Sequence, residues 1–200
     1  MIKNFDKALN DLKLGKAVIV VDAFERENEG DLVMCAETVT KETLVFGMLH
    51  ARGLMCLPCE GNILDRLEIP IMVARTTDPL ETPFTVSVDG ITTGTGMSVD
   101  DRIKTIDIML NPDSKPTDLK RPGHLFPLRA RKNLLLERQG HTEASIELMK
   151  LIDAKQNMSV IIEIMNEDAT MSRMPDLEVF AKKHDLQIIS IEEIYKKVYG

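Results

Sequence analysis

Residues 17–36 read AVIVVDAFERENEGDLVMCA, two apolar runs that enclose a charged segment. The first run, 17–21, is wholly apolar and rich in β-branched residues, which is typical of a strand buried on both faces. The second run, 32–36, predicts another strand. We therefore expect two core strands joined by a charged loop over residues 22–31.

Strands and helices alternate on both sides of this stretch, with no internal repeat and no low-complexity linker. Apolar periodicity and capping residues predict helices over 4–14 and 41–51, a helix that begins at a Ser98–Asp101 capping box, and helices over 142–152 and 176–184. Further strands are predicted over 54–57, 84–88, 160–164 and 188–189. The pattern favours one layered α/β or α+β domain over residues 1–200.

Composition narrows the classes of function. The chain has 200 residues, 44% of them hydrophobic, and a formal net charge of −7. This charge argues against a protein that coats nucleic acid or an anionic membrane, because both partners reward clustered Lys and Arg. With neither a membrane-length apolar run nor a signal-peptide pattern, we expect a cytoplasmic protein that has no membrane partner.

The chain has three cysteines, and two of them, Cys56 and Cys59, form one CxxC. We interpret them as buried or incidental thiols rather than a redox or zinc motif.

The charged segment 22–31 carries five carboxylates in ten residues, and Glu25, Glu27, Glu29 and Asp31 follow at intervals of two. In an extended stretch they would point to one side and repel one another unless a cation or protons intervened. Oxygen-rich ligand sets prefer hard cations such as Mg²⁺ or Mn²⁺. The alternative is a solvated charged turn.

A glycine-rich segment, TTGTGMS at 92–98, stands directly before a predicted helix. Exposed amides, hydroxyls and the positive helix end could together hold a phosphate. The segment is neither a Walker A motif nor a dinucleotide-binding fingerprint, so a plain turn with a helix cap is the competing interpretation.

Three further side chains are candidates for acid–base or metal chemistry. His124 and His141 each lie beside a glycine in a predicted loop, and imidazole serves both as a metal ligand and as a proton shuttle. Glu163 interrupts the apolar run 160–164, where a buried carboxylate would have a raised pKa, although it could also lie on a solvated face. Together these features suggest a hard-metal enzyme that acts on a phosphorylated metabolite.

Four blocks of this sequence resemble one family, in the family's order. They are RENEGD at 26–31, RPGHLFPL at 121–128, GHTEA at 140–144, and Glu163 followed by NEDATM at 166–171. The chain resembles 3,4-dihydroxy-2-butanone 4-phosphate synthases from about residue 17 to about residue 194. The resemblance implies an α-β-α sandwich with a mixed sheet, a homodimer, and two divalent ions, Mg²⁺ or Mn²⁺, at each active site.

The implied reaction converts D-ribulose 5-phosphate to L-3,4-dihydroxy-2-butanone 4-phosphate and formate, in riboflavin biosynthesis. By matching motifs, Glu27 and His141 are the expected metal ligands, and His124 and Glu163 the expected essential catalytic groups, with Glu29 and Asp31 as further candidates for proton transfer. The residues expected to contact the substrate are Arg26, Glu27, Asp31, Thr95, Arg138, Gln139, Gly140, His141, Thr142 and Glu163.

The sequence departs from the family pattern at a few loop positions. Ala169 and Ser172 stand where Gly and Ala are usual, Asn133-Leu134 replaces a frequent Gly pair, and the turn at 93–98 is longer than usual. In bifunctional relatives a GTP cyclohydrolase II domain follows, and we expect only the lyase here. The rival hypotheses are a metal-dependent sugar-phosphate isomerase or aldolase, and a catalytically silent phosphosugar-binding module.

Overall fold

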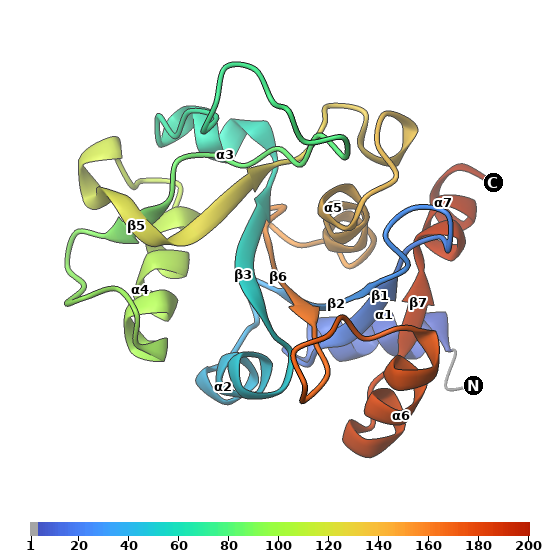
Figure 1. Ribbon diagram of the computed structural model, residues 1–200. Helices are drawn as coiled ribbons and strands as arrows, with labels where there is room; N and C mark the ends of the chain where they lie inside the picture. Colours follow the sequence, from blue (N-terminus) through green and yellow to red (C-terminus); the bar gives the residue numbers. More distant parts are fainter. Residues whose placement is uncertain (1–3) are drawn as a thin grey trace.

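The computed structural model describes residues 4–200 as one mixed sheet covered by helices on both faces (Figure 1). The sheet has seven strands in the order β4-β5-β3-β6-β2-β1-β7. They are β1 (Val18–Val21), β2 (Gly30–Cys35), β3 (Arg52–Cys59), β4 (Val88–Gly90), β5 (Leu119–Arg129), β6 (Ser159–Ile164) and β7 (Ile188–Ser190). The expected α-β-α sandwich with a mixed sheet is confirmed.

Two hydrophobic cores lie on opposite faces of this sheet, because successive strand side chains point to opposite sides. Val18 and Val20 pack into the core under α1 (Phe5–Lys13), α5 (His141–Leu151) and α7 (Ile191–Tyr199). Ile19 and Val21 pack into the other core, under α2 (Lys41–His50), α3 (Gly61–Arg66), α4 (Val99–Leu110) and α6 (Met174–His184). The wholly apolar run at 17–21 therefore reflects burial on both faces.

Local signals located most elements well. Asn4, Thr40 and Ser98 accept hydrogen bonds from the first turns of α1, α2 and α4, as their side chains predict. The strand predicted over 84–88 is wrong in its extent, because Phe84 and Thr85 make only isolated bridges and β4 covers Val88–Gly90. The strand β5, the short helix α3 and the C-terminal helix α7 were not predicted.

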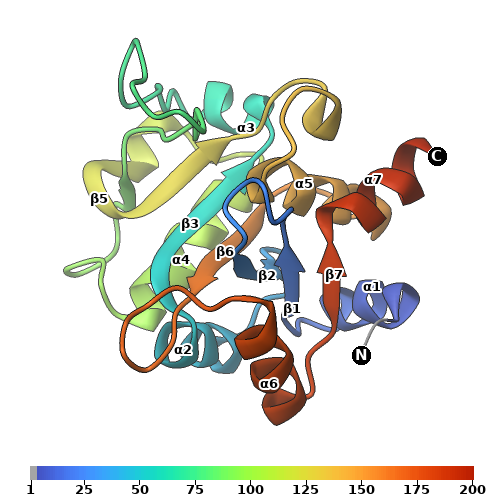
Figure 2. The ribbon, with the colours of Figure 1, turned by 45° about the vertical axis from the view of Figure 1, so that its right-hand side comes forward.

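Strand pairing brings distant polar residues to one place. β2 pairs antiparallel with both β1 and β6, and the register sets Asp31 directly opposite Glu163. The loop between β1 and β2 and the beginning of α5 lie close to this point, as Figure 2 shows from the side. None of the helices within residues 4–200 is long and apolar enough to span a bilayer.

Candidate active site

The acidic loop, residues 22–31, lines a small hollow of about 130 Å³ together with β2, β6 and the start of α5. Four of its lining residues are apolar and the others are polar or charged. Its lining residues are Arg26, Glu27, Glu29, Asp31, Cys56, Thr82, Phe84, Leu128, Arg138, His141, Thr142, Ile161 and Glu163. Eight of the residues that the sequence singled out are thus brought together.

Asp22 shapes the acidic loop by accepting hydrogen bonds from the loop's own backbone. Its carboxylate accepts from the amides of Glu27 and Glu29, each at 2.8 Å, and from the guanidinium of Arg26 at 3.0 Å. Residues 24–27 consequently form a turn rather than an extended stretch. The expectation that alternate carboxylates share one side is wrong for Glu25, which is exposed and lies outside the hollow.

Arg173, which sequence reasoning did not single out, holds the loop from the other side. Its Nη1 donates to the carbonyl oxygens of Glu27 and Asn28, both at 2.6 Å, and lies 3.5 Å from the carboxylate of Glu29. Asn28 has φ 55°, a left-handed conformation that Asn tolerates better than most residues. The guanidinium therefore fixes the strained backbone that presents Glu27 and Glu29.

Asp31 and Glu163 face each other across β2 and β6 at the base of the hollow. Burial and the neighbouring carboxylates of Glu163, Glu27 and Glu29 raise the pKa of Asp31 to about 7, although the charge of His141 opposes them. Glu163 is half-buried, and its Oε2 accepts the amide of Leu54 at 2.7 Å. The prediction that a carboxylate projects from a core strand is confirmed.

Glu27 and His141 both line the hollow, with 3.4 Å between Glu27 Oε2 and His141 Nδ1. Burial disfavours the imidazolium of His141, but the carboxylates of Asp31, Glu27 and Asp22 outweigh burial and raise its pKa to about 9. The hydrogen bond with His141, assisted by Arg26, holds the pKa of Glu27 below its usual value despite partial burial. Burial has the opposite result at Glu29, whose pKa it raises.

Asp22, Glu27 and His141 form the only group of three potential metal ligands within residues 4–200, with ligand atoms within 4.8 Å of one another. Nε2 of His141 is buried and has no hydrogen-bond partner anywhere within residues 4–200. Both oxygens of Asp22 accept hydrogen bonds from the loop, whereas Oε1 of Glu27 and Nε2 of His141 make no hydrogen bond within residues 4–200. Asp22 was noted among the five carboxylates but was not singled out as a member of this cluster.

The segment 138–142 contributes to the hollow unevenly. Arg138 points into it while pairing with the buried Glu143 at 2.7 Å, and Thr142 lines it from the first turn of α5. Gly140 is the N-cap residue of α5, and a Cβ on it would lie 2.1 Å from the guanidinium of Arg138. Gln139 is exposed and borders a separate surface depression beside Glu25.

His124 lies apart from this hollow. It belongs to β5 rather than to the predicted loop, four residues before Leu128, a separation of about 13 Å along a strand. Nδ1 of His124 lies 2.7 Å from the buried carboxylate of Asp89 on β4. Sequence reasoning missed Asp89, although a lone acid that ends an apolar strand was a usable signal.

Thr95 is exposed on the turn between β4 and α4, also outside the hollow. The capping box is only half formed, because Ser98 accepts the amide of Asp101 while the Asp101 carboxylate accepts the amides of Gly94 and Gly96, both at 3.2 Å. These hydrogen bonds favour the competing interpretation, a plain turn with a helix cap, over a phosphate site at the glycine amides. Asp101 already occupies them.

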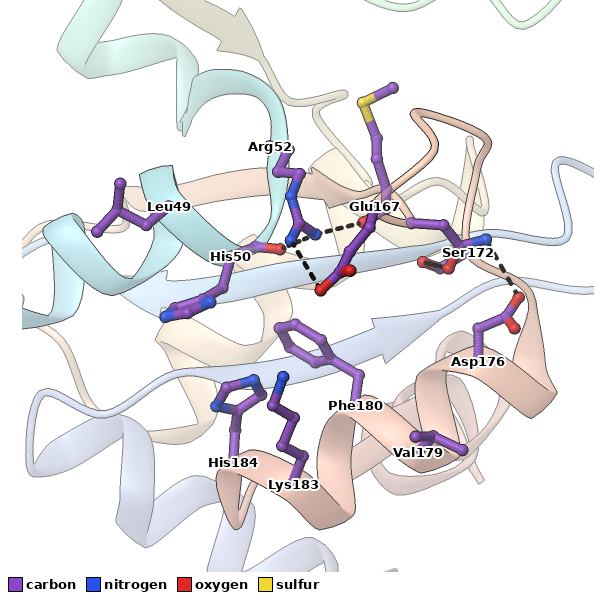
Figure 3. A pocket seen from close by; sticks show the side chains of 12 residues that line it. Leu49, His50, Arg52, Glu167, Ser172, Asp176, Val179, Phe180, Lys183 and His184 are labelled. Carbon is purple, nitrogen blue, oxygen red and sulfur yellow. Dashed lines mark hydrogen bonds and ion pairs between the residues drawn. The ribbon is translucent and has the colours of Figure 1, made fainter.

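A second hollow, of about 410 Å³, lies between the end of α2 and α6 (Figure 3). The ring centroids of His50 and His184 lie 4.9 Å apart there, beside Phe180. Burial, the charge of His50 and that of Lys183 lower the pKa of His184. None of the residues predicted for catalysis, substrate or metal lines this hollow.

The cysteines fit their interpretation as structural thiols. Cys35, Cys56 and Cys59 are all buried and free. Burial, together with the nearby carboxylates of Glu163 and Asp31, raises the pKa of Cys56, which lines the base of the hollow.

Comparison with known proteins gives a consistent result. A family model described as 3,4-dihydroxy-2-butanone 4-phosphate synthase matches residues 6–197. The riboflavin biosynthesis protein RibBA of Bacillus cereus (strain G9842) is 48% identical over 194 residues, which cover 97% of this chain and 49% of that protein. The chain thus spans about half the length of the curated relatives that it matches first.

Two solved structures match nearly from end to end. A 3,4-dihydroxy-2-butanone 4-phosphate synthase in complex with two magnesium ions has a TM-score of 0.90 and 36% identity, over 98% of this chain and 96% of that one. The corresponding enzyme of Candida albicans has a TM-score of 0.91 and 38% identity, over 100% of both chains.

Proposed function

Because the chain belongs to the 3,4-dihydroxy-2-butanone 4-phosphate synthase family, we propose that it converts D-ribulose 5-phosphate to L-3,4-dihydroxy-2-butanone 4-phosphate and formate, a step of riboflavin biosynthesis. The observation that carries the proposal is the single hollow that gathers Glu27, His141, Asp31 and Glu163. The two products together contain the atoms of the substrate, so the reaction needs no oxidant or reductant.

The residues of the hollow fit a divalent metal. Carboxylate oxygen and a buried imidazole nitrogen without a partner are ligands suited to Mg²⁺ or Mn²⁺, and a related structure contains two magnesium ions. Glu27 and His141 would hold the metal. When bound, it supplies positive charge that stabilises negative charge developing on substrate oxygens.

Asp31 is suited to move protons, since its pKa of about 7 leaves both protonation states accessible near neutral pH. In the proposed reaction the ketose is enolised, loses its C1 hydroxyl to become a methyl ketone, undergoes a skeletal shift and releases C4 as formate. Each stage requires a proton to leave or reach a carbon or oxygen. Asp31 and Glu163 can exchange such protons from one side of the hollow.

Glu163 and Arg138 are held in place before any substrate arrives. The amide of Leu54 fixes one oxygen of Glu163, and a Cβ at Gly53 would come within 2.5 Å of that same oxygen. Glu143 fixes Arg138, whose guanidinium can bind an anionic group of the substrate. This prior positioning reduces the entropic cost of reaching the transition state.

A homodimer would bring together predicted residues that lie far apart within one chain. His124 and Thr95 lie outside the hollow that gathers eight of the predicted residues, so a second copy that brings its His124 to this hollow would complete the site. Exposed apolar side chains on the turn beside Thr95 are available for such a contact, since Ile91 and Met97 are 52% and 50% exposed.

Two solved relatives named as this synthase match the chain over nearly their whole length, which supports assigning the proposed reaction to the domain described here. A cytoplasmic location is part of the proposal, and free buried thiols agree with a reducing compartment.

The decisive experiment incubates purified protein with ribulose 5-phosphate and Mg²⁺, with and without EDTA, and follows formate and the methyl ketone by NMR. We expect both products together, only when metal is present. Glu27→Gln should abolish them, because the amide replaces a ligand carboxylate. Glu25→Gln is the matched control on the same loop, and it should retain activity because Glu25 is exposed outside the hollow.

Other outcomes would select a rival hypothesis. Isomerisation or splitting of the pentulose without formate would indicate a metal-dependent isomerase or aldolase. No turnover with either Mg²⁺ or Mn²⁺, combined with retained binding of ribulose 5-phosphate, would indicate a silent phosphosugar-binding module.

A further inference from the structure

We propose that Asp89 is a positioning residue that sets the tautomer and orientation of His124, so that Nε2 of His124 is the atom that exchanges protons with the substrate. The inference rests on the proposed function, in which His124 acts on the reacting molecule. It assigns a role to a residue on a different strand that none of the family motifs includes.

One carboxylate clamps His124 at two points. Oδ1 of Asp89 accepts the backbone amide of His124 at 2.9 Å, and Oδ2 lies 2.7 Å from Nδ1 of the same residue. Two contacts from one rigid group restrict rotation of the His124 side chain, which otherwise would be free because 44% of it is exposed.

Asp89 is itself held firmly. Its side chain is only 5% exposed, and the turn before α4 packs directly on it. At Gly96, with φ 84°, a Cβ would lie 2.1 Å from Oδ2 of Asp89, so a side chain at this position would collide with the carboxylate. The buried Arg102 is close enough to interact electrostatically with Asp89. The carboxylate therefore cannot turn away from His124.

The chemistry of the pair decides the tautomer. An ionised carboxylate only accepts hydrogen bonds, so Nδ1 of His124 must carry a proton. In neutral His124 the lone pair is then on Nε2, at the opposite edge of the ring from Asp89. Nε2 can accept a proton from a substrate and return it later, while the charge on Asp89 stabilises the intermediate imidazolium.

Asp89→Asn tests this role in the full-length protein. Oδ1 of Asn can still accept the backbone amide, but its NH₂ group can donate to Nδ1 and so favour the wrong tautomer, with the proton on Nε2. We expect kcat for formate release to fall by about 100-fold or more, with KM changed by less than about threefold. Nitrogen-15 NMR of the imidazole should show the proton on Nδ1 in the wild type and on Nε2 in the variant.

Asp118→Asn is the matched control, because Asp118 caps the turn before β5 by accepting the Lys115 amide and has no contact with His124. It should leave kcat unchanged. In a His124→Gln background, Asp89→Asn should add almost no further loss, since its effect acts through the imidazole.

The results separate this inference from the proposed function. Unchanged kcat in Asp89→Asn, or a loss of kcat that accompanies a lowered Tm while the tautomer stays the same, would overturn the positioning role. A wild-type protein that releases no formate would instead overturn the proposed function, and the tautomer of His124 could still be measured.

Discussion

Asp31, Glu27 and His141 show how a few buried charges determine one another's protonation. Burial and the neighbouring carboxylates raise the pKa of Asp31 to about 7, while the carboxylates of Asp31, Glu27 and Asp22 raise the pKa of His141 to about 9. Because these groups interact, their protons dissociate in steps that belong to the cluster as a whole and not to one residue.

The stability of the metal-free protein should reflect the pKa of His141. Its folded value, about 9, exceeds the usual 6.5, so the extra stability is fully present below pH 6.5 and is lost as pH rises through 9. In EDTA, denaturant unfolding should give a free energy about 1–3 kcal/mol lower at pH 9.5 than at pH 6.5. His141→Gln should flatten this difference, and an equal slope in the variant would contradict the prediction.

Arg173 should stabilise the acidic loop through its hydrogen bonds to two backbone carbonyls. Arg173→Met removes its hydrogen bonds to the oxygens of Glu27 and Asn28, so we expect the free energy of unfolding to fall by about 1–3 kcal/mol. Affinity for Mn²⁺, measured by calorimetry, should fall as well, because Glu27 loses its support. Arg75→Met is the control, since Arg75 is exposed and makes no hydrogen bond or ion pair within residues 4–200. Equal metal affinity in both variants would remove the role given to Arg173.

At the scale of elements, the site depends on where strands and helices end. β2 begins at Gly30, so Asp31 already belongs to the sheet and faces Glu163, while Glu27 and Glu29 remain on the loop. α5 begins at His141, which places that imidazole at the helix entrance beside Glu27. Small shifts in these boundaries would separate the ligands.

Two loop positions that depart from the family pattern have left-handed backbone. Ala169 has φ 65° and Leu134 has φ 46°, a region that costs a residue with a Cβ roughly 1–2 kcal/mol. Both stand where glycine is frequent in the family that the sequence resembles. The departures therefore add strain to loops without removing a predicted catalytic group.

Ala169→Gly should stabilise the turn between β6 and α6. Glycine adopts the left-handed conformation freely but loses more chain entropy on folding, so a net gain of about 0.5–1 kcal/mol is expected from thermal or denaturant unfolding. Ala74→Gly, at an exposed position without positive φ, should give no gain. A lower Tm for Ala169→Gly would show that the strain is absent in solution.

At the scale of the whole molecule, the predicted catalytic residues fall into two groups on different parts of the sheet. The loop group centres on Glu27 and His141 between β1, β2 and α5, and the other group centres on His124 and Asp89 between β4 and β5. In the sheet order, β3 lies between β5, which carries His124, and β6, which carries Glu163 of the hollow. A symmetric dimer could make two complete sites from such half-sites.

Complementation would reveal sites shared between subunits. Glu27→Gln and His124→Gln homodimers should each be inactive, but mixing them under conditions of subunit exchange should restore about a quarter of wild-type formate release, because half of the dimers are mixed and each has one intact site. Analytical ultracentrifugation should show a dimer. A mixture that stays inactive although exchange is demonstrated would argue for sites built within one chain.

The sequence by itself determined much of this protein. Apolar runs such as 17–21 and the capping residues Thr40 and Ser98 predicted strands and helices, because burial on two faces and unsatisfied helix amides act locally. The motifs containing Glu27, His141 and Glu163 predicted the residues of the hollow. Each of these signals lies within a few consecutive residues.

Only the tertiary structure decided the rest. The opposition of Asp31 and Glu163 arises from strand register over 132 positions of sequence, and the support of the acidic loop by Arg173 joins residues 146 positions apart. The occupation of the Gly94 and Gly96 amides by Asp101, and the pairing of His124 with Asp89, are choices among hydrogen-bond partners. A hydrogen bond forms only between groups that the fold brings within about 3 Å of each other. The local sequence does not show which distant groups will come that close.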